Sequence, residues 1–286
     1  MQVNILLNNY IPKYTQGVPQ SNQLIQLDYA VAKSIVQDPN NTYVLRGEPT
    51  LYPYLFELLD QLQGKNFILI THATDVEMIK RYKKIIPYIS INYDGYTNDT
   101  IRNSTVLTAN MMNLINAFQY NTNTILRLAY IINPYNIEWL LTDADIMMKL
   151  CSQYSNMKLP YFSIYQQSEL HGEEKFTWMS LPEELIRQVN AKGILTQKNY
   201  DYLLAYTRHI TTPCASIMNS TVVAWDSTVR LCQSHRFIEK IGDLRELPLA
   251  TIMENTTTYR LECAQCPHMH YCWFAQHYKE NFDGNQ

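Results

Sequence analysis

The chain has 286 residues, of which 46% are hydrophobic and 17% charged, a composition typical of a folded globular protein. This length suits one large α/β domain, or one domain with a small annex. The net charge of −3 provides no broad basic surface, so we expect no generic nucleic-acid binding.

Targeting signals are absent from the sequence pattern. No window approaches the roughly eighteen apolar residues of a membrane span, and no basic region followed by a long apolar stretch opens the chain. We therefore expect no membrane association and a cytoplasmic location, where thiols stay reduced. The low glycine and high tyrosine content is typical of AT-rich genomes. A viral origin is one hypothesis, and it would place the protein in the host cytoplasm or the virion.

Short apolar runs alternate with segments of helical periodicity through the first 165 residues. The apolar runs predict strands, and apolar residues recurring every three or four positions predict helices. In chain order, the strands are expected over 3–7, 43–45, 67–70, 88–92, 124–132 and 161–164, and the helices over 24–36, 52–62, 75–84, 105–119 and 137–151. This α/β alternation predicts a parallel sheet covered by helices, in the form of a partial (β/α)6 TIM-like barrel over 1–165.

The alternation stops after residue 165. Residues 166–180 are polar and charged, and helices are expected over 183–191 and 197–209, so 166–210 is predicted as a helical linker. Residues 211–286 are predicted as a small cysteine-rich extension, with a hairpin turning at Asp226 and Ser227 and a helix over 249–253.

Five of the six cysteines lie in the last quarter of the chain. Cys263 and Cys266 form a C-x2-C pair, the spacing at which two thiolates reach one metal centre. Cys214 and Cys232, one near each end of the predicted hairpin, would complete four sulfur ligands. Four thiolates suit a 4Fe-4S cluster or a tetrahedral zinc ion, and the spacing does not separate them. Free thiols or two disulfides are the alternative.

Other candidate ligands have simpler explanations. Cys151 falls in an apolar helical pattern and is expected in the core. His268 and His270 are expected as exposed loop residues, because four cysteines already suffice. Asp143 and Asp145 would point about 200° apart on a helix, so we expect solvated side chains rather than a shared metal site.

The motif G-E-P-T-L at 47–51, after the second predicted strand, resembles the G-G-E-P-T-L segment of radical SAM enzymes, whose backbone binds the amino group of S-adenosylmethionine. Residues 89–95, with Arg102 further on, are similar to the fourth strand and following loop of that family. The resemblance covers most of the chain and implies the same partial barrel.

The C-terminal cysteines resemble the twitch or SPASM extension, which carries auxiliary 4Fe-4S clusters. The resemblance to single-cluster twitch domains implies Cys214, Cys232, Cys263 and Cys266 as ligands. Cys272 is either an alternative fourth ligand in place of Cys214 or a free thiol. No second cluster is expected, because the chain has too few cysteines.

One departure from the family is large. Radical SAM enzymes hold their catalytic cluster through C-x3-C-x2-C in the loop after the first strand, and this loop contains no cysteine. Tyr10, Tyr14 and Gly17 have the matching spacing. Without three thiolates, a cluster able to cleave S-adenosylmethionine has no support, so we expect no catalytic residues.

Smaller departures agree with this one. Arg46 replaces the first glycine of the G-G-E-P motif, and His72 stands in a segment where the family has T-N-G. We therefore do not expect S-adenosylmethionine binding. Gly47, Glu48 and Pro49 are predicted to be a vestigial binding segment that serves as a tight turn, with Pro49 at the helix start.

Two functions follow from the resemblance. The first is a non-catalytic radical-SAM-like protein, a pseudoenzyme with one structural 4Fe-4S cluster, or zinc as the alternative, that binds a protein or peptide partner. A cluster with four cysteine ligands has no open iron, so it would stabilise the tail rather than act on a substrate. The second is a radical SAM-type enzyme that modifies a peptide or small molecule, using an unorthodox first cluster or a partner chain.

Overall fold

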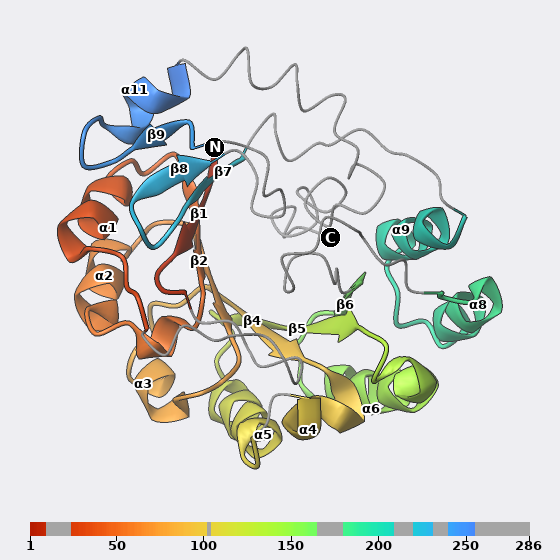
Figure 1. The fold of residues 1–286 in the computed structure, drawn as a ribbon. Coiled ribbons are helices and arrows are strands. Elements are labelled where there is room, and N and C mark those ends of the chain that lie inside the picture. Colours follow the sequence, from red (N-terminus) through yellow and green to blue (C-terminus); the bar gives the residue numbers. More distant parts are fainter. Residues whose placement is uncertain (10–23, 102–103, 165–179, 209–219, 231–239, 255–286) are drawn as a thin grey trace.

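A computed structural model of the chain describes residues 1–9, 24–101, 104–164, 180–208, 220–230 and 240–254. Its centre is a nine-stranded sheet that curves into an open barrel, with helices around the outside (Figure 1). This arrangement confirms the predicted fold class, a partial α/β barrel.

All six predicted barrel strands are present. They form parallel neighbours in the order β6-β5-β4-β3-β2-β1, and the sheet continues through β7, β8 and β9. The strands are β1 (Gln2–Leu6), β2 (Thr42–Arg46), β3 (Phe67–Thr71), β4 (Tyr88–Tyr93), β5 (Ile125–Ile132), β6 (Tyr161–Ile164), β7 (Ser220–Val223), β8 (Thr228–Arg230) and β9 (Gly242–Asp243).

The predicted helices are also present, some of them shorter than expected. The α-helices are α1 (Tyr29–Ile35), α2 (Leu55–Gln61), α3 (Val76–Arg81), α4 (Asn98–Ile101), α5 (Leu107–Phe118), α6 (Leu140–Gln153), α8 (Glu183–Ala191), α9 (Gln197–Thr207) and α11 (Leu249–Glu254), and the 3-10 turns are η1 (Pro49–Leu51), η2 (Gly95–Thr97) and η3 (Ile137–Trp139). Helix α1 starts later than predicted because Asp28 is its N-cap, accepting the N–H groups of Ala30 and Val31 at 2.8 and 3.2 Å.

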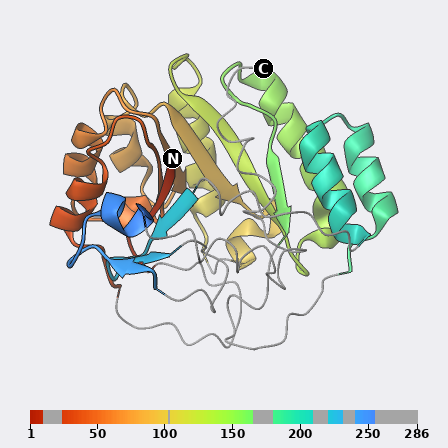
Figure 2. The ribbon, with the colours of Figure 1, turned by 90° about the horizontal axis from the view of Figure 1, so that it is seen from above.

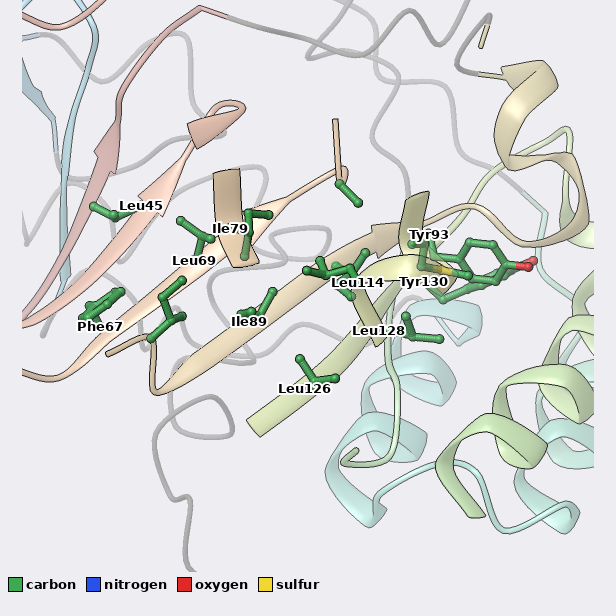
Figure 3. Packing of buried hydrophobic residues seen from close by; sticks show 14 of the residues in the cluster. Leu45, Phe67, Leu69, Ile79, Ile89, Tyr93, Leu114, Leu126, Leu128 and Tyr130 are labelled. Atoms are coloured by element: carbon green, nitrogen blue, oxygen red, sulfur yellow. The ribbon is translucent and has the colours of Figure 1, made fainter. Parts of the chain in front are cut away.

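The hydrophobic core lies between the sheet and the outer helices. Alternate strand residues enter it, and Leu69, Ile89 and Leu126 are among those fully buried (Figure 3). Farther along the sheet, the rings of Tyr93 and Phe162 pack on either side of Tyr130, with centroids 6.3 and 5.4 Å away. Because strand side chains alternate between faces, the intervening residues lie on the inner face of the barrel.

Helices α8 and α9 cover the last parallel strand (Figure 2). The side chain of Asn199 on α9 accepts a hydrogen bond from the Phe162 N–H and donates one to the Phe162 carbonyl, both at 2.8 Å. These bonds satisfy backbone groups at the free edge of β6, which would otherwise be open to pairing. The two helices, predicted as part of a linker, therefore pack directly on the barrel.

The predicted hairpin is formed by β7 and β8. Its turn includes Ser227, whose φ of 67° is in the left-handed region. Strand β7 pairs in parallel with β1, with Asn4 opposite Val222, so the hairpin extends the barrel sheet. From the rest of the predicted cysteine-rich extension, the structure describes residues 240–254, which include β9 and α11.

Candidate functional site

The carboxyl ends of β1 to β5 meet at one edge of the barrel, which we call the mouth. Ligands of α/β barrels and open parallel sheets bind at this edge. The mouth is lined by polar side chains with at most 6% exposure: Asn8, Glu48, Thr71, His72, Asp94, Asn133 and Asn136.

Glu48 is the most connected of these residues. Its carboxylate is fully buried and accepts hydrogen bonds from the hydroxyl groups of Thr50 at 2.6 Å and Thr71 at 2.7 Å. The other oxygen accepts the backbone N–H of His72 at 2.7 Å. Burial raises the pKa of Glu48 above its ordinary value, although these donors act in the opposite direction. The carboxylate thereby ties the turn after β2 to the end of β3.

The turn at Gly47 has the tight geometry that the sequence predicts. Gly47 has a φ of +82°, and a β-carbon there would lie 2.5 Å from the side-chain oxygen of Asn8, so only glycine fits. Pro49 opens the 3-10 turn η1, as expected for a proline at the start of a helical segment.

Asn8, two residues after the end of β1, binds the same turn. Its amide nitrogen donates to the Glu48 carbonyl at 2.8 Å, and its amide oxygen accepts the Glu48 N–H at 3.0 Å. The Glu48 carbonyl also accepts the N–H of Leu51 at 3.0 Å. Both backbone polar groups of Glu48 are therefore engaged within the protein.

Asp143 was predicted to be solvated, and this prediction was wrong. The residue is fully buried, and its carboxylate accepts the Tyr130 hydroxyl at 2.7 Å and the Tyr96 N–H at 2.8 Å. Burial raises the pKa of Asp143. The helical pattern that placed Asp143 correctly on α6 carried no information on the partners that Tyr130 and the β4 loop provide.

Asn136 and His72 are two further mouth residues that the sequence did not single out as site residues. Asn136 is fully buried and donates to the carbonyls of Asp94 at 3.2 Å and Ile131 at 2.9 Å, joining the ends of β4 and β5. The ring nitrogen Nε2 of His72 lies 3.4 Å from the amide nitrogen of Asn92. Buried side chains thus hold the mouth loops in a fixed arrangement before any ligand binds.

The predicted metal ligands Cys214, Cys232, Cys263, Cys266 and Cys272 lie outside the described residues. In the described ranges, no group of three or more histidine, cysteine or acidic side chains is placed to hold a metal ion.

The catalytic cluster of the resembling family does not fit the barrel loop. The segment between β1 and α1, residues 7–28, contains no cysteine to ligate iron. Cys151 is elsewhere, on α6, and burial raises the pKa of its thiol to about 11. A thiol of this kind packs as a small apolar group. Cys151 was expected in the core, and the structure places it partly buried against the core.

Within the described part of the chain, no helix has the length and apolarity needed to cross a membrane. No family model and no curated protein matches the sequence at a significant level.

Solved structures do match the fold. The structure of anSMEcpe with bound AdoMet aligns with a TM-score of 0.61 and 13% identity, over 95% of this chain and 84% of that one. SuiB of Streptococcus suis bound to its precursor peptide SuiA aligns with a TM-score of 0.65 and 12% identity, over 95% of this chain and 70% of that one. SuiB bound to S-adenosylmethionine gives a TM-score of 0.62 and 12% identity, over 95% and 71% of the two chains. The chain therefore shares the partial-barrel fold of these proteins.

Proposed function

We propose that this protein is a binding scaffold, built on a radical SAM-type barrel, that holds a protein or peptide partner at the mouth without generating a radical. The observation that carries the proposal is the combination of a preorganised mouth with a β1 loop that has no cysteine. Reductive cleavage of S-adenosylmethionine needs an iron cluster with one open iron, and this loop supplies no ligand for one.

A peptide partner is supported by two observations. SuiB, which shares the fold, was solved with its precursor peptide bound. The half-buried amide of Asn92, near the carboxyl end of β4, is also a group that can bond to peptide backbone groups.

The expectation that S-adenosylmethionine would not bind needs correction. Both anSMEcpe and SuiB hold this ligand in the same fold, so the fold gives no ground for excluding it. In this protein, the Glu48 N–H and carbonyl are already bonded to Asn8, so a bound molecule would need other contacts. Binding without cleavage is compatible with the scaffold that we propose.

We further propose that residues 211–286 form a twitch or SPASM-like unit with one 4Fe-4S cluster. Its ligands would be Cys214, Cys232, Cys263 and Cys266, with Cys272 as the alternative to Cys214. Such a cluster would tie the tail to the hairpin that extends the barrel sheet, and its binding free energy would contribute to folding.

A radical SAM-type enzyme that works with a partner chain is the second candidate, and the ligands of anSMEcpe and SuiB favour it. One experiment distinguishes the binding scaffold from the enzyme. Protein purified without oxygen and reconstituted with iron and sulfide is incubated with S-adenosylmethionine and dithionite, and 5′-deoxyadenosine is measured. The scaffold produces none above the protein-free control, whereas cysteine-dependent formation by this chain alone overturns the proposal.

A further inference from the structure

The inner face of the barrel differs chemically from the core face. On β4 and β5, Ile89 and Leu128 enter the core, whereas Ser90 and Arg127 lie on the opposite face and are directly paired with each other. The helices lie outside the curved sheet, so this opposite face is the concave one (Figure 1). It also carries Asn4 and Asn92, which lie opposite the apolar residues Val44 and Ala129, so polar groups occupy separate positions on this face.

In strands β1 to β8, the charged residues are confined to this face. These strands contain no aspartate or glutamate, and their charged residues are Arg46, Arg127 and Arg230. The short strand β9 adds Asp243, whose carboxylate is already paired with Lys240 and Arg245. Arg46 is opposite Leu6, and Arg230 is opposite Val222, which is itself opposite Asn4. All three arginines therefore alternate with core residues and belong to the inner face.

Two of these arginines have no counterion among the residues that the structure describes. In both Arg127 and Arg230, the Nε atom is buried and makes no hydrogen bond, and neither side chain has an ion pair among the described residues. Arg46, at the mouth, is already engaged in an interaction. A guanidinium group stays protonated at every physiological pH, so burying part of it without an acceptor is unfavourable unless a ligand supplies one.

Arg127 and Arg230 lie on opposite arms of the curved sheet. Strands β4, β3, β2, β1 and β7 separate β5 from β8 in the sheet order, and the curvature turns the two arms toward each other (Figures 1 and 2). Both residues are half-buried, so each retains exposed surface. A phosphate site gathers several cations around one group, whereas two separated guanidinium groups suit two separate carboxylates.

We propose that the inner face binds an acidic peptide segment, with one carboxylate at Arg127 and another at Arg230. This inference rests on the proposed peptide-binding function and extends the peptide site from the mouth along the inner face, because Arg127 lies toward the amino end of β5. Each guanidinium fork can hold a carboxylate through two parallel hydrogen bonds. Ser90 and Asn92 lie beside Arg127 on the same face, where they can bond to the peptide backbone.

The test uses the full chain, purified without oxygen, and fluorescein-labelled octapeptides of glutamate, glutamine and lysine. Binding is measured by anisotropy for the wild type and for Arg127→Gln, Arg230→Gln and Arg127→Lys. The matched control is Arg187→Gln, because Arg187 is exposed on α8 and pairs with Glu183, away from the inner face. This control removes the same charge from the protein.

We expect the glutamate peptide to bind in preference to the other two. Arg127→Gln and Arg230→Gln should each weaken it by roughly tenfold or more, since each removes a charge-assisted contact. Arg127→Lys should weaken binding of the glutamate peptide less than Arg127→Gln does. The affinity of Arg187→Gln for this peptide should stay within about twofold of the wild type. Thermal unfolding of the two Gln variants should occur no lower than in the wild type, because an uncompensated cation has been removed.

The possible outcomes distinguish failure of the acidic-peptide inference from failure of the proposed peptide-binding function. Equal binding of the glutamate and glutamine peptides overturns the acidic specificity and leaves peptide binding standing. Loss in Arg187→Gln equal to that in Arg127→Gln overturns the assignment of the inner face. If no peptide binds, both proposals fall. Binding of only inorganic phosphate, lost in Arg127→Gln, would show a site for a small anion and would overturn the peptide proposal.

Discussion

The carboxylate of Glu48 accepts a hydrogen bond from the hydroxyl of Thr71 at 2.7 Å, although the two residues belong to different strand ends. The contact joins the turn after β2 to the end of β3, and both residues are fully buried. A G-E-P motif that the sequence suggested as a remnant of ligand binding is thus part of the internal framework of the mouth.

Replacing Glu48 should be costly. Glu48→Ala leaves the hydroxyl groups of Thr50 and Thr71 and the N–H of His72 without their acceptor, so we predict a loss of about 3 kcal/mol in unfolding free energy, measured with urea. Glu57→Ala, at an exposed position on α2, is the control and should change it by less than about 0.5 kcal/mol. Equal losses of unfolding free energy in the two variants would contradict a stabilising role of these buried hydrogen bonds.

The same carboxylate should make stability depend on pH. Burial raises the pKa of Glu48 above its ordinary value of 4.5, so the folded protein holds this proton more tightly than the unfolded chain. The resulting stabilisation is complete below pH 4.5 and is lost as the pH rises through the folded-state pKa. Glu48→Gln has no such proton, so the stability of the wild type relative to this variant should fall as the pH rises. A constant difference, or one that grows with pH, would contradict this prediction.

Gly95 should tolerate no side chain. Its φ is +71°, and a β-carbon would collide with the carboxylate of Asp143 and the ring of Tyr130. We predict that Gly95→Ala lowers the unfolding free energy by about 3 kcal/mol or more, because backbone strain and steric overlap add. Gly64 has a similar φ of +78° but no atom within 4 Å of the added carbon, so Gly64→Ala isolates the strain and should cost only about 1 kcal/mol.

The cysteine assignment predicts the metal content. Reconstituted protein should hold ~4 iron and ~4 sulfide per chain, with a broad visible absorbance band, if the tail carries a single cubane cluster. Cys263→Ala and Cys266→Ala should each lose most of the iron, whereas Cys151→Ser, at a described position on α6, should keep it. If zinc is found in place of iron, the cysteine ligands remain as assigned and the cubane cluster is replaced by a zinc site. Full iron in both tail variants would refute the ligand assignment.

The sequence predicted the barrel because its signals are local. Each parallel strand is a short apolar run bounded by turn residues, and the hairpin turn at Ser227 also has a local signature. Predicted helix boundaries were less accurate where a capping residue decides them. The N-cap Asp28 makes α1 begin at Tyr29, later than the apolar pattern predicted.

The mouth could not be predicted in the same way, because its contacts join distant segments. Asn8 and Glu48 are 40 residues apart, and Tyr96 and Asp143 are 47 residues apart. Nothing in the periodicity around Asp143 distinguishes a buried acceptor from a solvated carboxylate. Likewise, the shared face of Arg127 and Arg230 emerges only when strand register is known, since β7 pairs with β1 at the start of the chain.

We propose that this barrel keeps a structured mouth but does not cleave S-adenosylmethionine by itself. The most direct test of this proposal is the amount of 5′-deoxyadenosine formed from S-adenosylmethionine and dithionite by anaerobically reconstituted protein of measured iron content. The account predicts no formation above the level of a Cys263→Ala and Cys266→Ala double variant. Formation that exceeds that level and scales with the concentration of this chain alone would contradict it.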